Sequence, residues 1–99
     1  MAQFDVYTLP ATSMLFVDLQ SGAVDNYNTR LVAPLVPADP RLKPLKSVNK
    51  EIMFQGRIYV FMPQLMSSVR TRDLGRNIGS ISDYRDQIIA ALDVLFVGV

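Results

Sequence analysis

The chain has 99 residues, 10 basic and 9 acidic side chains, a formal net charge of +1, and neither cysteine nor histidine. This length fits one domain, and the missing Cys and His exclude disulfides, thiolate nucleophiles, cysteine zinc sites and histidine general bases, and with them most hydrolase sites. The nearly neutral charge argues against autonomous binding to nucleic acid or to an anionic membrane, and no residue pattern indicates a cofactor or a metal.

Alternating apolar and polar residues predict a β-hairpin at the start of the chain, with strands over 3–8 and 14–20 and a turn over 9–13. Asp18 falls in the second strand among apolar neighbours. Because a buried charge must be paired, we interpret Asp18 as a hydrogen-bonded structural acid rather than as a catalytic group.

The next segment is rich in turn residues and holds Ala23 and Val24 outside any strand. A further strand is predicted over 30–35. We expect Pro34 and Pro37 to end it, because proline has no N–H to donate to a sheet.

Residues 37–50 form a connection that combines prolines with basic side chains, which predicts a semi-extended, solvated segment. Its positive charge also suits an acidic peptide, and a plain soluble loop is the alternative. The basic residues are Arg41, Lys43, Lys46 and Lys50.

The segment 51–62 carries a strong hairpin signal. Apolar segments over 52–54 and 57–62 flank a Gln55-Gly56 turn, where glycine accepts a positive φ. One more strand is predicted over 65–74, and Gly75 and Gly79 interrupt the path from there to a final helix.

The final helix is predicted to start near Ser80 or Ser82, since Ser80 and Asp83 fit a capping box. Gly98 is placed as its C-terminal cap. Helical spacing predicts a core face made of Tyr84, Ile88, Ala91, Leu92, Leu95 and Val99, and an exposed face made of Asp86, Ala90, Asp93 and Val97.

The helix runs into apolar residues, Val94 to Val99, where charged or polar residues are usual. Such a segment packs against its own fold, a second subunit or a partner. We favour a partner surface, and an ordinary helix end is the alternative.

Hydrophobic residues make up 49% of the chain, more than one small core readily buries, which favours a homodimer over a well-filled monomer. The apolar stretch 88–99 is interrupted by Asp93 and is too short to span a bilayer. The first residues do not form a signal peptide. We therefore expect a cytoplasmic protein without membrane contact.

Several segments carry a family resemblance: Phe16-Val17-Asp18-Leu19-Gln20-Ser21, Arg30-Leu31-Val32 with Pro34-Leu35, Met66-Ser67-Ser68-Val69, Arg85 with Ile88 to Asp93, and Gly98-Val99. In this order and at this chain length, they resemble the CcdB family, the gyrase-poisoning toxins of bacterial toxin–antitoxin modules. No single one of these segments is diagnostic, and the collinear set carries the resemblance.

The resemblance implies a mainly β fold: a small SH3-like, CcdB-type antiparallel barrel closed by a C-terminal helix, in one domain over 1–99 that pairs as a homodimer. It implies a toxin that performs no chemistry, binds the DNA gyrase A subunit and traps gyrase on cleaved DNA, blocking replication. A CcdA-like antitoxin neutralises such a toxin. The toxin–antitoxin complex represses its own operon at operator DNA, and such modules serve plasmid maintenance.

The resemblance also places the gyrase contacts at the C-terminal residues and at an apolar pair after the second strand. Well-known family members carry tryptophan in place of Val97, isoleucines in place of Ala23 and Val24, and asparagine in place of Asp93, so we expect weaker binding or a different gyrase target. The matched gyrase contacts are Ala23, Val24, Asp93, Phe96, Val97, Gly98 and Val99, and the expected antitoxin contacts are Arg41, Lys43, Lys46 and Lys50.

Two other functions stay open. One is an mRNA-cleaving toxin of the MazF or Kid type, with Arg30 beside Thr29, or Arg70 beside Thr71 and Arg72, acting at a phosphodiester. The Gly-x-Glu and Arg-Pro motifs of that family are absent. The other is a dimeric adaptor, which explains the apolar helix end equally well.

Overall fold

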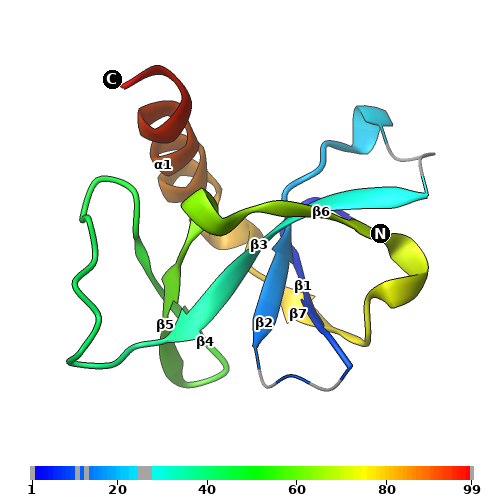
Figure 1. Cartoon of the computed structure of the whole chain (residues 1–99), viewed down its shortest axis with the longest axis horizontal. Coiled ribbons are helices and arrows are strands. Elements are labelled where there is room, and N and C mark those ends of the chain that lie inside the picture. The colour runs from blue at the N-terminus through cyan, green and yellow to red at the C-terminus, as the bar shows by residue number, and fades with distance from the viewer. Residues whose placement is uncertain (1, 11, 13, 25–27, 99) are drawn as a thin grey trace.

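The fold is taken from a computed structural model, which describes residues 2–10, 12, 14–24 and 28–98 (Figure 1). Its helix and strands are β1 (Asp5–Thr8), β2 (Leu15–Asp18), β3 (Thr29–Pro37), β4 (Glu51–Phe54), β5 (Arg57–Phe61), β6 (Ser67–Arg70), β7 (Asn77–Ser80) and α1 (Arg85–Val97). Short 3-10 helices η1 (Gly22–Val24), η2 (Pro63–Leu65), η3 (Thr71–Asp73) and η4 (Ser82–Tyr84) lie between them. None of the helices in these ranges is long and apolar enough to cross a membrane.

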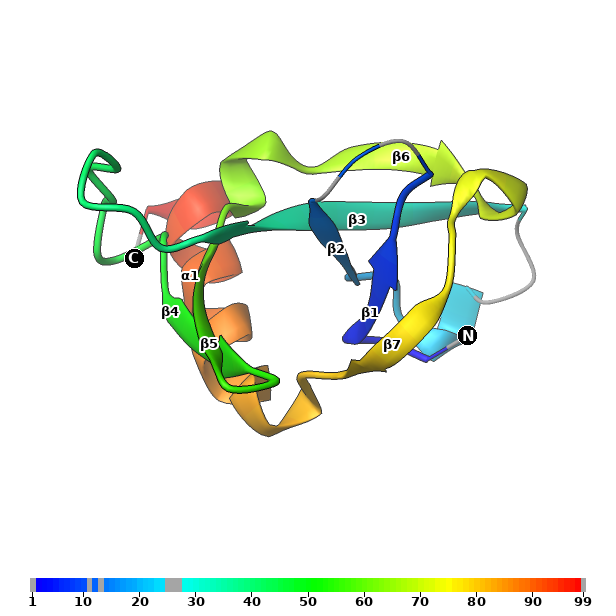
Figure 2. The same ribbon diagram turned by 90° about the horizontal axis from the view of Figure 1, so that it is seen from below.

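The strands form one antiparallel sheet in the order β4-β5-β3-β2-β1-β7, with β6 also paired to β3. The sheet curls into a half-barrel, and α1 lies beside β4 and β5 at the side where the curl is open (Figure 2). The expected fold class, mainly β with a curled antiparallel sheet and a C-terminal helix, is confirmed.

The core lies inside the curl because alternate strand residues point there. Val6 pairs with Val17, Val17 pairs with Ala33, and all three are fully buried. Ile88 and Ala91 of α1 complete this core, with Leu92 and Tyr84 packed partly buried against it. The predicted core face of the helix is thus confirmed for Tyr84, Ile88, Ala91 and Leu92. Leu95 is half-buried and is not among the residues packed against the core, and Val99 lies outside the described residues.

Strand β3 continues through both prolines that were expected to end it. One edge of β3 pairs with β6 over Thr29–Val32 and then with β5 over Leu35–Pro37, so Pro34 falls in the gap between these two partners. The Pro34 carbonyl accepts a hydrogen bond from the Met62 N–H at 3.0 Å. In an antiparallel strand the N and O of one residue point to the same side. The nitrogen of Pro34 therefore faces the gap between β6 and β5, where the sheet pairing does not call for an N–H donor from Pro34.

The Gln55-Gly56 turn joins β4 to β5 as predicted, and both residues have positive φ, 51° and 77°. Two positive φ values define the hairpin turn whose twist matches the strands beside it. Gln55 takes this conformation without being glycine, and its side-chain Nε2 donates to the Ile78 carbonyl at 2.9 Å.

The segment 65–74 is not one strand, contrary to prediction. It contains only the short strand β6, between the 3-10 helices η2 and η3. Strand β7, in turn, was missed, because its Gly79 reads as an interruption. In the structure Gly79 has a φ of 149°, and a Cβ there would lie 3.0 Å from the Phe54 ring, so the strand needs a glycine at this contact.

The predicted capping box at the helix start is also wrong. The α-helix begins at Arg85, after the 3-10 helix η4, and the residue before it, Tyr84, makes no side-chain capping bond. The Ser80 hydroxyl accepts instead from the Ser82 N–H at 3.1 Å. A tighter first turn has replaced the capped start that the sequence pattern suggested.

Asp18 is a structural acid, as interpreted from the sequence. Its Oδ2 accepts from Arg30 Nη2 at 2.7 Å and from Arg30 Nε at 3.0 Å, and both side chains are almost fully buried. Both donors converge on one carboxylate oxygen, and hydrogen bonds between charged groups are stronger than those between neutral ones. The pair connects the end of β2 to the start of β3.

We expect Asp18→Asn to lower the free energy of unfolding by about 3–5 kcal/mol, because it leaves the Arg30 charge buried without its counter-ion. Urea denaturation followed by circular dichroism measures the loss. The matched control is Asp39→Asn, which breaks the exposed Asp39–Arg41 pair and should leave stability nearly unchanged. Equal effects of the two substitutions would contradict the importance of the buried pair.

Candidate functional site

The C-terminal end of α1 is apolar and exposed. Phe96 is 65% exposed and Val97 67% exposed, and Asp93 lies one turn earlier on the exposed face. Gly98 caps the helix in the left-handed conformation, with φ 75°, and its N–H donates to the Val94 carbonyl at 3.0 Å. Val99 lies outside the described residues. The fold therefore leaves the apolar side chains at this helix end mostly in water, and we call residues 96–98 the tip.

Further large apolar side chains are exposed elsewhere. Met53 and Ile58 are cross-strand partners on β4 and β5 and are 52% and 41% exposed. Leu65 is 57% exposed on η2, which packs against α1. Of these exposed apolar side chains, Met53 and Ile58 lie next to each other across two paired strands.

The second predicted contact region is the 3-10 helix η1, which carries Ala23 and Val24. Both side chains are exposed, Val24 by 40%, and Leu31 on β3 is exposed by 37% beside them. Leu19, Gln20, Ser21, Val24, Thr29 and Leu31 line an open hollow on this face.

Within one chain the tip and η1 are not brought together. Both views place η1 and the C-terminal end of α1 at opposite ends of the molecule (Figures 1 and 2). The resemblance implies a binding surface built from the C-terminal residues of both subunits of a dimer together with the apolar pair of the loop. One chain by itself does not bring the tip and η1 together.

The basic cluster lies in the segment 38–50, which contains no helix or strand. Arg41 is already paired, since its Nη2 lies 2.8 Å from Asp39 Oδ2, and this contact lowers the pKa of Asp39 and raises the pKa of Arg41. Lys43 and Lys46 are exposed and make no ion pair with any residue that the structure describes. Lys50 is half-buried, and its carbonyl accepts from the Phe61 N–H at 2.9 Å. The positive charge open to a partner is therefore centred on the two exposed lysines.

The arginines proposed for an mRNA-cleaving mechanism differ in their exposure to solvent. Arg30 is 1% exposed and is paired with Asp18, so no phosphodiester reaches it. Arg70, Thr71 and Arg72 line an open hollow with Asn28. Among the described residues that line it there is no carboxylate to serve as a general base.

Together, these features define a class: a small mainly β protein whose notable surfaces are apolar and suited to binding. A sequence model of the CcdB family, described as CcdB protein, matches residues 3–98 of the chain. The chain therefore belongs to the CcdB family, whose members are toxins of toxin–antitoxin systems.

We expect Val97→Ser to change the free energy of unfolding by less than about 0.5 kcal/mol, because the side chain is mostly in water. Ile88→Ala, on the buried face of the same helix, should cost about 2–5 kcal/mol. Chemical denaturation of both variants measures the contrast. A large loss from Val97→Ser would mean that the tip belongs to the fold and is not free for a partner.

Proposed function

We propose that this toxin binds the DNA gyrase A subunit through its tip and traps gyrase in its complex with cleaved DNA. The observation that carries the proposal is the exposure of Phe96 and Val97 at the end of a helix whose other face buries Ile88 and Ala91 in the core. Apolar side chains kept in water at a fixed position are typical of a recognition surface. Family membership supplies gyrase as the partner.

We also propose a homodimer. The tip and η1 lie at opposite ends of one chain. In a dimer, the tip of one copy can lie on the same face as η1 of the other copy. A two-fold pair presents every contact twice, which suits a two-fold partner such as the gyrase A dimer. The exposed Met53, Ile58 and Leu65 provide apolar area for pairing outside the tip.

The proposed action needs no covalent step by the toxin. Gyrase opens and closes a protein gate, and a ligand that binds the open, cleaved state more tightly shifts the population toward it by its differential affinity. The toxin's contribution is shape and apolar area held in place by the fold. Asp93 adds a negative charge beside the tip, which selects a gyrase surface that does not repel it.

The test is a plasmid cleavage assay with gyrase from the native host, ATP and the purified toxin, stopped with detergent and protease. The full chain should produce linear DNA. Removal of Val97 to Val99 should abolish the linear product, because it removes apolar area at the centre of the proposed contact. Leu45→Ser, at a side chain 66% exposed in the segment 38–50, is the matched control and should still linearise the plasmid.

A truncated toxin that still linearises the plasmid would overturn the tip proposal. Light scattering on the truncated chain should still report a dimer, which separates loss of binding from loss of assembly. No linear product from the full chain would overturn the gyrase proposal. It would favour one of the two alternatives, an adaptor protein or a toxin that cleaves RNA.

For the antitoxin we propose a CcdA-like chain whose acidic, disordered segment folds on the toxin, with Lys43 and Lys46 as the main charged contacts and Arg41 and Lys50 at the margins. The open charge of the two lysines supports this assignment. Disordered acidic segments bind such surfaces with strong dependence on salt. Operator DNA is then bound only by the toxin–antitoxin complex.

The double charge reversal Lys43→Glu with Lys46→Glu should weaken binding of the cognate antitoxin at least tenfold in low salt, because attraction becomes repulsion. Calorimetric titration at low and high salt measures the change. The control reverses Arg76 and Arg85, which are also exposed, and so alters net charge equally. Unchanged antitoxin affinity in the lysine variant would remove the segment 38–50 from the binding site.

A further inference from the structure

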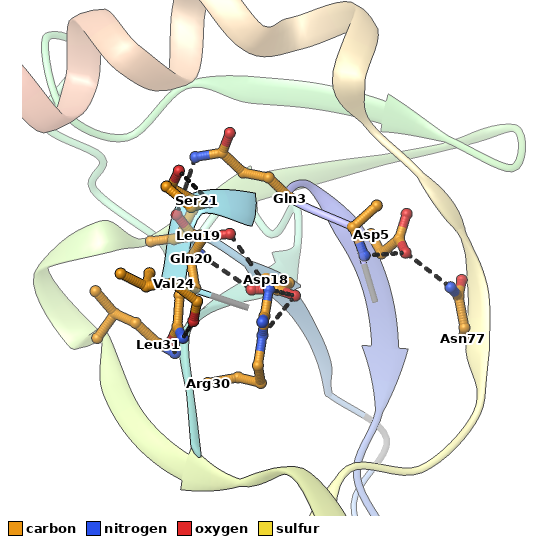
Figure 3. A network of polar contacts seen from close by, with 12 residues as sticks. Gln3, Asp5, Asp18, Leu19, Gln20, Ser21, Val24, Arg30, Leu31 and Asn77 are labelled. Carbon is orange, nitrogen blue, oxygen red and sulfur yellow. Dashed lines mark hydrogen bonds and ion pairs between the residues drawn. The ribbon is translucent and has the colours of Figure 1, made fainter. Parts of the chain in front are cut away.

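The loop that carries Val24 is tied to the sheet by the side-chain amide of Gln20 (Figure 3). Gln20 Nε2 donates to the Val24 carbonyl at 2.6 Å. Gln20 Oε1 accepts from the Leu31 N–H on β3 at 3.0 Å. One amide group thus joins the end of η1 to the strand beside it.

The backbone of Gln20 is in turn fixed by the buried ion pair. Its N–H donates to Asp18 Oδ1 at 3.0 Å, and its carbonyl accepts from Arg30 Nη2 at 3.3 Å. Asp18 and Arg30 are 0% and 1% exposed, so they belong to the rigid interior. A continuous series of hydrogen bonds therefore runs from the core through Gln20 to the carbonyl of Val24.

Inside the loop, Ser21 closes a compact turn. Its Oγ accepts from the Ala23 N–H at 3.1 Å, and its carbonyl accepts from the Val24 N–H at 3.1 Å. These bonds shape the turn but are local, and they do not attach it to β3. Among the residues that the structure describes, Gln20 provides the side-chain link from Val24 to the strand.

We infer that Gln20 is a positioning residue for partner binding: it holds Val24 and Leu31 together as one apolar contact surface on the toxin. The inference rests on the proposed binding of gyrase. Val24 and Leu31 both line the open hollow next to Gln20, and Figure 3 shows them on the same side of that residue. A loop already held in its bound conformation loses less entropy on binding, so the partner is bound more tightly.

The amide suits this role because it has both a donor and an acceptor. Gln20→Glu keeps an acceptor for the Leu31 N–H and loses the donor to the Val24 carbonyl. Gln20→Met keeps similar length and loses both. The matched control is Gln55→Met, since Gln55 Nε2 also donates to a backbone carbonyl, that of Ile78 at 2.9 Å, on the β4–β5 turn.

The experiment measures binding of each full-length variant to purified gyrase A subunit, together with thermal unfolding. We expect both Gln20→Met and Gln20→Glu to weaken binding about tenfold, because both lose the hydrogen bond to the Val24 carbonyl and a lost hydrogen bond costs about this much. Gln55→Met should bind like the unsubstituted toxin. Full affinity in Gln20→Met would overturn the inference.

A double-substitution cycle with Val24→Ala separates positioning from a general structural role. If Gln20 acts by holding Val24, the effect of Gln20→Met on affinity should largely disappear once Val24 is alanine. An undiminished effect in the Val24→Ala background would overturn the positioning role.

Amide hydrogen exchange of the free toxin tests the same inference without gyrase. Gln20→Met should speed exchange at the N–H groups of 22–24 and at Leu31, while exchange at Val17 in the core stays slow. Unchanged exchange in the loop would overturn the inference even if gyrase binds. If the unsubstituted toxin does not bind gyrase, the proposed function fails. In that case faster exchange in the loop of Gln20→Met would still show that the hydrogen bond of Gln20 keeps Val24 in place.

Discussion

The ion pair between Asp18 and Arg30 is the constraint on which this structure depends. Two charges in the interior of so small a protein are tolerated only when each is fully paired, so β2 and β3 must meet in one register, with Asp18 opposite Val32. The Gln20 backbone is held by both members of the pair, since its N–H donates to Asp18 Oδ1 and its carbonyl accepts from Arg30 Nη2. The buried pair therefore helps to set the geometry of the loop that follows Gln20 and carries Val24.

Local sequence signals were sufficient where one residue type determines the backbone. The Gln55-Gly56 turn, the Gly98 cap and the two faces of α1 all followed from conformational preference or periodicity. Prediction failed where pairing between distant segments decides the outcome. Pro34 is accepted in β3 because β5 and β6 share one edge of that strand, an arrangement that the residues near Pro34 do not encode.

The candidate sites show the same division. Exposure of the tip could be predicted, because helical spacing places Val97 opposite the core-facing Ile88 and Ala91. Its distance from η1 could not, because it depends on how far the whole sheet curls. The pairing of Arg41 with Asp39 was also missed, although the two residues are close enough in sequence to suggest it. Assigning a binding role to Gln20 required hydrogen bonds that no composition or periodicity reveals.

The pairing of β1 with β7 has a consequence for synthesis of the toxin. Asp5 lies opposite Ser80, so the earliest strand of the chain finds its second neighbour only after most of the protein has left the ribosome. Until then β1 has an open edge, and contacts this distant in sequence form slowly. The tip follows β7 in the chain, so a nascent chain displays it only once every strand of the sheet has been made. Translation products that stop before α1 therefore lack the tip that we propose as the gyrase contact.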